Sequence, residues 1–456
     1  MIFKKILKQK LFLLLGDILI IILSTNLAYI IRLKTSIISY LGLNDAITTI
    51  LLMLTIYIIS FYIFDLYNIR LKSKSIRFVS LVLGSLILAS LITAVFFYFF
   101  PFKLGRGVFF ISLVLIGILI TIWRMFYSDF FRFAVPPRKV LIVGPKKKAK
   151  AVFSILKTHP EYELIGLIDD KLKKIEFSKE GVLLDSLSLE NIVNNYKIDD
   201  IIVTIDTTRK VELSKNLVNC KMKGINIYDI PTLYEAFLDK LPVSYIKPKW
   251  LLYSDGFGKL GNKIYKRIKR GIDLLISSIL LIISTPVGII IFLAIKLTSK
   301  GPIFIKQERV GENHKHFNLI KFRTMVANAE SGDPIWAKEN DHRITKIGNV
   351  LRKTRLDELP QLINVVKGEM SLTGPRPERE FFVKKLIQKI PFYSLRFSVK
   401  PGLTGWAQIN YGYGASEKDA LEKLQYDLYY VKNMSLLLDF GILLKTIRIV
   451  IFGMGR

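Results

Sequence analysis

Two adjacent carboxylates, Asp357 and Glu358, lie in a segment of the chain that is otherwise rich in cations and turn residues. The segment reads RKTRLDELPQLINVVKGEMSLTGPRP, with Arg352 and Arg355 before the acidic pair and Arg376 after it. An ionised carboxylate held among arginines suits attack on a phosphoryl group, because the cations attract the phosphate and neutralise its charge. Asp357 and Glu358 are therefore the candidate catalytic residues.

Pro360 is expected to place the acidic pair at the start of a helix. Its ring would clash with the carbonyl of Leu356, four residues earlier, so the regular helix should begin at about Asp357. Asp357 would then be the N-cap, at the positive end of the helix dipole, where an anion or a phosphate is stabilised. The alternative interpretation is an acidic first turn that only complements the dipole.

Further cations stand where they can bind phosphate. Lys321 and Arg323 alternate along a predicted strand, so they share one face and can clamp a diphosphate, although a salt-bridged sheet face is the alternative. Arg376 lies in the sequence GPRP, whose prolines stiffen the backbone around its guanidinium. Arg396 and Lys400 precede a second stiff turn, PGLTGW. The candidate phosphate-binding residues are Lys321, Arg323, Arg352, Arg376, Arg396 and Lys400.

The metal that suits this segment is magnesium. His314, His316 and His342 have neither cysteine partners nor the spacing of zinc ligands. Carboxylates among phosphate-binding cations instead indicate Mg²⁺, which prefers oxygen ligands and substrate phosphates.

The composition indicates a membrane protein with anionic partners. The chain has 456 residues, a formal net charge of +30 and 51% hydrophobic residues. This charge suits the negative inner leaflet of a membrane and phosphate-bearing substrates, whereas a nucleic-acid partner would not explain the hydrophobicity. The single cysteine, Cys220, excludes an internal disulfide framework and is typical of a reducing compartment.

The first third of the chain contains four apolar stretches, each near the length that crosses a bilayer. They are residues 11–31, 47–64, 78–100 and 108–123. Cations gather before the first stretch, between the second and third, and after the fourth, at Lys4, Lys5, Lys8, Lys10, Arg70, Lys72, Lys74, Arg77, Arg124, Arg132, Arg138 and Lys139. By the positive-inside bias, both ends of this bundle are expected in the cytoplasm. Asp17, inside the first stretch, is either a functional intramembrane acid or a packing residue.

A soluble α/β domain is expected in the middle of the chain. Strand patterns alternate with helical stretches there, at 139–144, 163–168, 200–205 and 225–230, which predicts a small doubly wound sheet. The nucleotide fingerprint is poor, because Gly144 is followed by Pro145 and three lysines in place of the later glycines. We therefore expect a Rossmann-like domain that has lost dinucleotide binding, with residues 146–148 in a solvated loop; contact of these lysines with an anion is the alternative.

A fifth long apolar run, residues 271–297, differs from the first four. Cations flank it on both sides, so a full span would leave one cationic flank outside, against the positive-inside bias. Pro286 is expected to break the helix, and the hydroxyls of Ser284 and Thr285 can satisfy the carbonyls that it frees. The segment is therefore predicted to form a helix–break–helix hairpin at Thr285 and Pro286 that enters one leaflet and returns. A kinked full span is the alternative.

From Lys266 onward the chain resembles the bacterial sugar transferases, the monotopic phosphoglycosyl transferases that act on polyprenyl phosphate. The matching runs are KRIKRGIDLL, GPIFIKQERVG, FNLIKFRTM, DHRITKIGNVLRKTRLDELPQLINVVKGEMSLTGPRP and RFSVKPGLTGWAQIN. The resemblance implies that Asp357 is the nucleophile, that Glu358 helps to hold magnesium, and that Lys321, Arg352 and Arg376 bind phosphates. It also implies a re-entrant hairpin that pivots on Pro286. Arg355 and Thr285 depart from the family pattern, since many members have serine at these two positions.

The resemblance implies a complete architecture and reaction. We expect a mixed membrane protein: a four-span transmembrane bundle in 1–134, a Rossmann-like and non-catalytic domain in 135–255, and in 256–456 an α/β-type catalytic domain with the re-entrant hairpin. The implied enzyme is an undecaprenyl-phosphate glycosyl-1-phosphate transferase. It would attack a UDP-sugar, release UMP and pass the phosphosugar to polyprenyl (undecaprenyl) phosphate, as the first membrane step of exopolysaccharide, O-antigen or capsule unit assembly.

The expected partners are thus the UDP-sugar, the polyprenyl phosphate and membrane lipid, with no nucleic acid; a homodimer is compatible with the resemblance. The expected location is the bacterial inner membrane, with the catalytic domain on its cytoplasmic face. The rival functions are a nucleotide-sugar oxidoreductase or epimerase that uses the middle domain, and a non-catalytic membrane scaffold. An intact G-x-G-x-x-G would favour the first, and loss of the acidic pair would favour the second; neither is found in the sequence.

Overall fold

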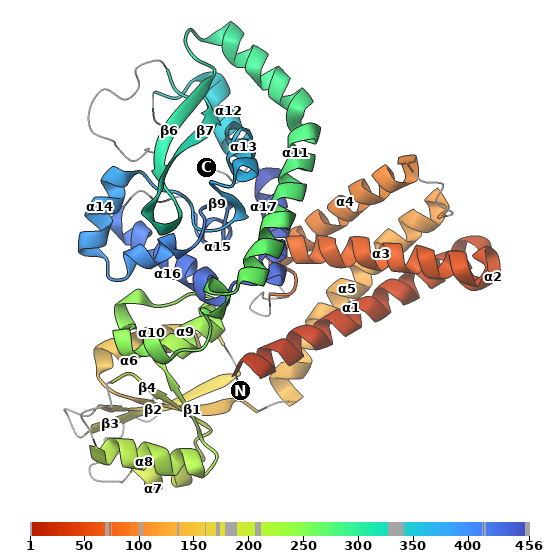
Figure 1. Cartoon of the computed structure of the whole chain (residues 1–456). Coiled ribbons are helices and arrows are strands. Elements are labelled where there is room, and N and C mark those ends of the chain that lie inside the picture. Colours follow the sequence, from red (N-terminus) through yellow and green to blue (C-terminus); the bar gives the residue numbers. More distant parts are fainter. Residues whose placement is uncertain are drawn as a thin grey trace. The chain divides into compact units, whose positions relative to one another are not determined.

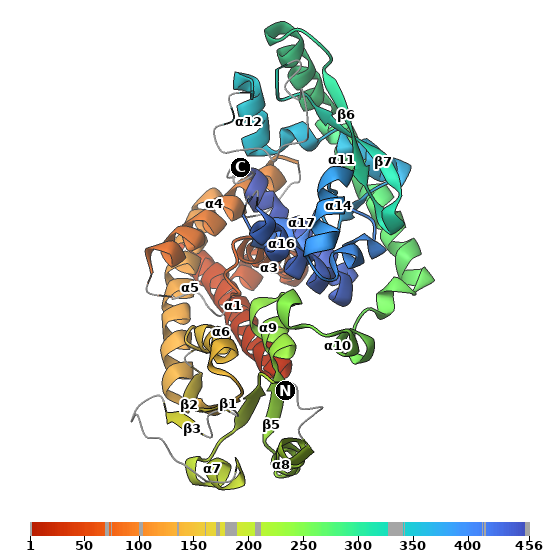
Figure 2. The ribbon, with the colours of Figure 1, turned by 90° about the vertical axis from the view of Figure 1, so that its left-hand side faces the viewer.

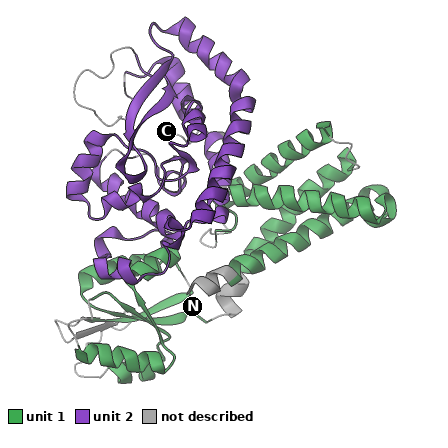
Figure 3. Ribbon diagram, in the orientation of Figure 1, with its two compact units in different colours: residues 1–237 green, residues 238–456 purple. Residues whose placement is uncertain are grey.

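The chain folds into two compact units, residues 1–237 and 238–456 (Figure 3). The computed structural model describes residues 2–68, 73, 75–99, 104–134, 136–159, 161–169, 174–177, 189–205, 211–326, 341, 343–412, 414 and 416–451. Among the cations and histidines that the sequence singles out, Arg70, Lys72, Lys74 and His342 lie outside the described residues.

Unit 1 begins with a bundle of long apolar helices (Figure 1, Figure 2). These are α1 (Ile2–Leu33), α3 (Leu43–Ile63), α4 (Ile76–Phe99) and α5 (Arg106–Ala134), with the short α2 (Ile37–Leu41) after α1. Helices α1 and α4 each pack against α3 and α5. All four coincide with the predicted apolar stretches, and each is long and apolar enough to cross a membrane.

Asp17 of α1 is buried inside this bundle and has a cationic partner. Its Oδ2 accepts a hydrogen bond from Nη2 of Arg124 at 2.6 Å, and both side chains are almost fully buried. Leu19 and Leu23 of the same helix are exposed, as expected for a surface that faces lipid. The ion pair links α1 to α5. It supports the interpretation of Asp17 as a packing residue.

The second part of unit 1 is an α/β domain. Its described strands are β1 (Arg138–Val143), β2 (Tyr162–Asp169), β3 (Lys174–Phe177), β4 (Asp200–Val203) and β5 (Asn226–Asp229), in the order β3-β2-β1-β4-β5. Neighbours are parallel except for β3, which is antiparallel to β2. Figure 1 shows α6 (Lys146–Leu156) and α9 (Ile230–Leu238) on one face, and α7 (Leu189–Tyr196) and α8 (Val211–Met222) on the other. The predicted parallel sheet is confirmed.

The three lysines after β1 are not in a loop, contrary to the prediction. Residues 146–148 form the first turn of α6, and Pro145 is its N-cap with φ −66°. Proline is well suited to this position, because it needs no N–H partner and its fixed φ suits the entry to a helix. The helix therefore begins at Lys146, and the lysine side chains stay exposed.

Unit 2 begins earlier than the predicted catalytic domain. The sequence places residues 238–255 with the sheet, but Leu241, Val243 and Ile246 are buried in a core that includes Leu424 and Leu428. This connecting segment folds as the short helices η2 (Val243–Tyr245), α10 (Pro248–Tyr253) and η3 (Gly258–Leu260). The strand and helix pattern gives no sign of the change, because these apolar residues would suit either core.

The fifth apolar run forms one long helix, α11 (Lys263–Thr298), and the predicted break is not found. The helix continues through Pro286 and bends along its length (Figure 1), as a proline inside a helix can kink it without ending it. The hydroxyls of Ser284 and Thr285 both donate to the carbonyl of Leu281, at 3.3 and 2.7 Å. The carbonyl that loses its usual N–H partner at Pro286 is that of Ile282, so the predicted role of the two hydroxyls is wrong in detail.

The rest of unit 2 surrounds two small β-structures with helices. Strands β6 (Phe304–Val310) and β7 (His316–Phe322) form an antiparallel hairpin, and β8 (Ser371–Thr373) pairs in parallel with β9 (Gly402–Thr404). The other elements are η4 (Glu312–His314), α12 (Lys346–Thr354), η5 (Leu356–Glu358), α13 (Gln361–Lys367), α14 (Glu380–Lys389), η6 (Tyr393–Ser398), α15 (Trp406–Asn410), α16 (Glu417–Asn433) and α17 (Leu436–Ile451). The buried Leu319 of β7 packs in one core with Leu362 and Val365 of α13, which fixes the hairpin beside the acidic pair.

Candidate active site

The acidic pair lies on a tight connection between α12 and α13. Helix α12 ends at Thr354, its C-cap Arg355 has a left-handed conformation with φ 56°, and Leu356–Glu358 then form the 3₁₀ turn η5. The carbonyl of Leu356 accepts a hydrogen bond from the N–H of Leu359 at 3.3 Å, a 3₁₀ bond that replaces the helical bond which Pro360 cannot make. Helix α13 therefore starts at Gln361 with Pro360 as N-cap. The prediction that the helix begins at Asp357, with Asp357 as its N-cap, is wrong.

Asp357 is nevertheless buried and surrounded by charge. Burial, followed by the negative charge of Glu358, raises the pKa of Asp357 to about 7, while Lys321, Arg376 and Arg352 act in the opposite direction. A carboxyl with this pKa changes charge near neutral pH, a property more typical of a reaction centre than of a surface acid. The structure thus brings Asp357 together with three of the predicted phosphate-binding residues.

Glu358 is the member of the pair whose ionised form its neighbours stabilise. Its Oε1 accepts a hydrogen bond from Nη2 of Arg376 at 2.6 Å. Burial alone would raise the pKa of Glu358, but Arg376 and Arg355 together hold this pKa below its usual value. Nearly half of the Arg376 side chain is exposed, so its remaining donors are accessible to a ligand.

The β6–β7 hairpin supplies further polar groups on one of its faces. Lys321 is paired with Ile305, so it shares a face with Gln307 and Arg309 of β6. The amide oxygen of Gln307 accepts hydrogen bonds from Nη2 of Arg309 at 2.6 Å and from Nζ of Lys321 at 3.4 Å. Burial and the charge of Arg309 lower the pKa of Lys321 to about 8. Sequence reasoning missed Gln307 and Arg309, although their period of two in GPIFIKQERVG is the signal that could have found them.

Arg323 does not join Lys321 in a clamp, contrary to the prediction. It lies just beyond the end of β7, and its Nη2 donates to the carbonyl and the hydroxyl oxygen of Ser299, at 3.0 and 2.7 Å. Its side chain therefore caps the C-terminal end of α11. Arg352 lies nearer the acidic pair, as its predicted role in phosphate binding requires. Its Nε donates to Oγ1 of Thr324 at 2.9 Å, and its charge lowers the pKa of Asp357.

Arg396 supports the turn that carries Arg376. It is buried against Asp427, with Nη2 at 2.8 Å from Oδ2, and the same Nη2 donates to the backbone carbonyl of Arg376 at 2.9 Å. Lys400 is half-buried and interacts with Arg270 and Glu312; burial, then the charge of Arg270, lowers its pKa. Neither residue is brought to the acidic pair by a side-chain contact, so their predicted direct role differs from the placement seen here.

The two proline–glycine turns stiffen each other. A Cβ atom at Gly374 would overlap the carbonyl oxygen of Lys400, and one at Gly402 would overlap the backbone N of Gly374. Only glycine allows this approach of two backbones, which are also joined by the β8–β9 pairing. The backbone of the turn that carries Arg376 is therefore rigid, a property that would limit the entropy lost on binding an anion.

The acidic pair has the donor set that Mg²⁺ uses. The described residues contain no group of three or more His, Cys, Asp and Glu side chains that could hold a metal ion by themselves. Mg²⁺ is usually held by one or two carboxylates together with substrate phosphates, so Asp357 and Glu358 fit it. Burial is the main cause of the raised pKa of Asp357, and the charge of Glu358 raises it further; a divalent cation relieves such repulsion between carboxylates.

Comparison with known proteins gives a consistent result. Residues 264–453 match the bacterial sugar transferase family. A UDP-N-acetylgalactosamine-undecaprenyl-phosphate N-acetylgalactosaminephosphotransferase of Aeromonas hydrophila is 37% identical over 298 residues, which are 65% of this chain and 68% of that protein. An undecaprenyl-phosphate galactose phosphotransferase of Salmonella typhimurium is 30% identical over 338 residues, 69% of this chain and 68% of that one. A UDP-glucose:undecaprenyl-phosphate glucose-1-phosphate transferase of Escherichia coli is 42% identical over 188 residues, 40% of each chain.

Two of these relatives, those of Aeromonas hydrophila and Salmonella typhimurium, are matched over two thirds of their length. The family membership that the motifs indicate is thereby confirmed. The chain belongs to the bacterial sugar transferase family, and it is a membrane-associated phosphotransferase.

Proposed function

We propose that the chain transfers a sugar-1-phosphate from a UDP-sugar to undecaprenyl phosphate, with release of UMP, through a covalent intermediate on Asp357. The observation that carries this proposal is a buried carboxylate with a pKa of about 7, next to an ionised glutamate and within the field of Lys321, Arg352 and Arg376. The names of the relatives support the choice of substrates.

The transfer has two balanced steps. In the first, an oxygen of ionised Asp357 attacks the β-phosphorus of the UDP-sugar, the bond from that phosphorus to the bridging oxygen breaks, and UMP leaves with the electron pair. In the second step, a phosphate oxygen of undecaprenyl phosphate attacks the same phosphorus. The bond between this phosphorus and the carboxylate oxygen of Asp357 then breaks, and the carboxylate is restored. Splitting the transfer avoids bringing two anionic substrates together at once.

The cations of the site have separate roles in this scheme. Arg376 and Arg352 bind phosphate oxygens, and Lys321, held by Gln307, stabilises the charge that develops near Asp357. Glu358, together with Asp357 and the substrate phosphates, would hold Mg²⁺, which when bound neutralises charge on the diphosphate. Positioning and charge neutralisation are the main needs of phosphoryl transfer.

We further propose that α11 enters one leaflet and returns to the cytoplasmic face. Both halves of the helix contact the same soluble unit: Arg270 donates to the carbonyls of Val365 and Val366, at 2.5 and 2.6 Å, while Ile291 and Ile295 pack against Phe322. A straight span would separate the two ends of the helix by about 30 Å of hydrocarbon. Contact of both halves with one unit supports a bent helix that stays on one side.

The sugar is a hexose or an N-acetylhexosamine in this proposal, since the relatives are named for N-acetylgalactosamine, galactose and glucose. Formation of the lipid-linked sugar diphosphate would be the first membrane step in the assembly of an exopolysaccharide, O-antigen or capsule unit.

The test is an assay of nucleotide release by the full chain in lipid nanodiscs that contain undecaprenyl phosphate and Mg²⁺, with a panel of UDP-sugars. We expect UMP and a lipid-linked sugar diphosphate in equal amounts with one sugar. Release of UDP would instead indicate direct glycosyl transfer, and no release with any UDP-sugar would contradict the proposal.

A further inference from the structure

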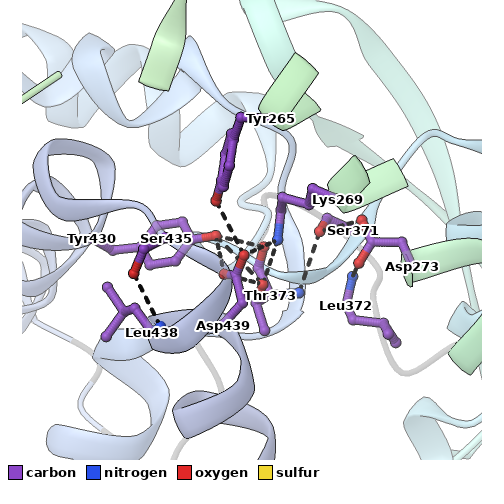
Figure 4. A network of polar contacts seen from close by, with 10 residues as sticks. All are labelled: Tyr265, Lys269, Asp273, Ser371, Leu372, Thr373, Tyr430, Ser435, Leu438 and Asp439. Carbon is purple, nitrogen blue, oxygen red and sulfur yellow. Dashed lines mark hydrogen bonds and ion pairs between the residues drawn. The ribbon is translucent and has the colours of Figure 1, made fainter. Parts of the chain in front are cut away.

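Polar side chains in the first half of α11 hold the strand β8 (Figure 4). Asp273 accepts hydrogen bonds from Oγ of Ser371 at 2.7 Å and from the N–H of Leu372 at 3.1 Å. One helical turn earlier, Nζ of Lys269 donates to Oγ1 of Thr373 at 2.6 Å. All three residues of β8 are therefore bound from the membrane helix.

Asp439 of α17 completes the network. This buried carboxylate accepts hydrogen bonds from Nζ of Lys269 at 2.9 Å, Oγ1 of Thr373 at 2.6 Å, the hydroxyl of Tyr430 at 2.7 Å and that of Tyr265 at 3.2 Å (Figure 4). One cation and three hydroxyl groups saturate the carboxylate, and buried polar networks that are fully satisfied are rigid. The network thus joins α11, β8, α16 and α17 through a single acid.

Strand β8 leads directly into the phosphate-binding turn. Thr373 is its last residue, Gly374 begins the turn, and Arg376 follows two residues later and binds Glu358. Because the turn is packed against the backbone of Lys400 at Gly374, a shift of β8 is passed on to Arg376 rather than absorbed. The contacts of Lys269 and Asp273 with β8 therefore help to set the position of the turn that carries Arg376, three residues after Thr373.

We propose that Lys269, Asp273 and Asp439 are positioning residues of the reaction: they fix β8 to the membrane helix and so align Arg376 with Glu358. This inference rests on the proposed function of Arg376 as a phosphate-binding residue. The three residues touch no substrate in this scheme. Through these residues, the geometry around Asp357 and Glu358 depends on how α11 packs against β8 and α17.

Arg270 provides the contrast within the same helix. Its guanidinium donates to the carbonyls of Val365 and Val366 at the end of α13, and among the described residues it makes no hydrogen bond to β8. It anchors α11 to α13 and, among the described residues, makes no hydrogen bond to the turn of Arg376. Removal of Arg270 and removal of Lys269 therefore both loosen the helix, but only the second is expected to act through Arg376.

The experiment is a double-mutant cycle on UMP release by the full chain in nanodiscs, with kcat and KM measured separately. Lys269→Met, Arg270→Met and Lys269→Arg are each combined with Arg376→Ala, and Arg267→Met, which removes an exposed charge from the same helix, is the control. Lys269→Met is expected to lower kcat roughly tenfold or more, since small misplacements of catalytic groups cost up to about a hundredfold. In the Arg376→Ala background the same change should cost less than about twofold, because interacting sites are not additive. Lys269→Arg should recover most of the activity.

Two results would overturn the proposal while leaving the reaction intact. They are full additivity of Lys269→Met with Arg376→Ala, and the same non-additivity for Arg270→Met as for Lys269→Met. If Arg376→Ala left kcat and KM unchanged, the phosphate site itself would be misassigned, and both the proposed function and this inference would fail. Thermal unfolding of each variant separates a loss of fold from a loss of alignment.

Discussion

Residues 146–148 of unit 1 and the cations around Asp357 in unit 2 are both clusters of positive charge beside a β-strand. The lysines of unit 1 are exposed on the first turn of α6, where water and salt screen their charges. In unit 2, burial lowers the pKa of Lys321 and raises the pKa of Asp357, so that both groups are poised within a few pH units of neutrality. Positive charge alone therefore does not mark a site. In the proposed site, opposite charges are instead buried together, with an accessible donor, Arg376, beside them.

The sharpest test of this contrast is Asp357→Asn, which keeps the shape of the site and removes the nucleophile. We expect UMP release to fall by at least about 10³-fold, because loss of a nucleophile removes the covalent route altogether. Lys147→Met, which removes one exposed cation of unit 1, should leave the rate unchanged. The measurement is the initial rate of UMP release with the preferred UDP-sugar.

Two controls accompany the Asp357→Asn prediction. Without acceptor, the wild-type chain should exchange labelled UMP into the UDP-sugar and carry a labelled phosphosugar, and the variant should do neither. The fold should be intact: burial raises the pKa of Asp357 above its unfolded value, so its ionisation costs stability as pH rises from about 4 to about 7. At pH 8 the asparagine variant should therefore unfold at the same or a higher temperature. Substantial turnover by the variant would rule out the covalent scheme.

Glu358→Gln should have the next largest effect, a loss of roughly 10²-fold. It should also shift the acid limb of the pH–rate profile. The wild-type rate should fall tenfold per pH unit below about 7, since Asp357 must be ionised to attack. The glutamate charge raises the pKa of Asp357, so its removal should move this limb to lower pH. An unchanged limb would mean that Asp357 is not the titrating group.

The bend of α11 gives a prediction about topology. Pro286→Leu should favour a straighter helix and lower activity, by roughly tenfold, because it would move the unit relative to the membrane surface. Val287→Leu is the matched control and should have little effect. In a Cys220→Ser background, single cysteines at Lys259 and Lys306, on either side of α11, should both react only with a reagent added to the cytoplasmic side. Reaction from opposite sides would establish a full span.

Removal of unit 1 should have a smaller effect on activity. The size of this effect should depend on the residue at which the shortened chain begins. A chain that begins at Leu238 keeps Leu241, Val243 and Ile246 in their core, and we expect it to retain UMP release. One that begins at residue 256 loses them, at roughly 1.5–3 kcal/mol for each large buried side chain, and should unfold at a clearly lower temperature. A well-folded chain from Leu238 without activity would make unit 1 part of the catalytic machinery.

The sequence predicted the long elements better than the local ones. Apolar runs and strand–helix alternation identify the helices of unit 1 and its parallel sheet, because each pattern repeats over many residues. The tight connection at Asp357 depends instead on a left-handed Arg355 and one 3₁₀ bond, which no periodicity reveals. The partners of Arg323 and Arg396 were missed for a similar reason. Ser299 lies 24 residues from Arg323, and Asp427 lies 31 residues from Arg396.

The smallest expected effect concerns the sheet of unit 1, which we predict not to bind NAD or NADP. A pyrophosphate needs free backbone N–H groups at the start of the helix after β1, and glycines that let it approach. Here Pro145 contributes no N–H at the N-cap, and lysine side chains occupy the first turn of α6. A Cβ at Gly144 would overlap the side chain of Thr204, so the end of β1 is closely packed against the residue that follows β4. Calorimetric titration of the full chain with each dinucleotide should give no binding heat, and Lys147→Met should change nothing. A micromolar dissociation constant that Lys147→Met weakens would mean that the exposed lysines do form a site, and the contrast between the two clusters would fail.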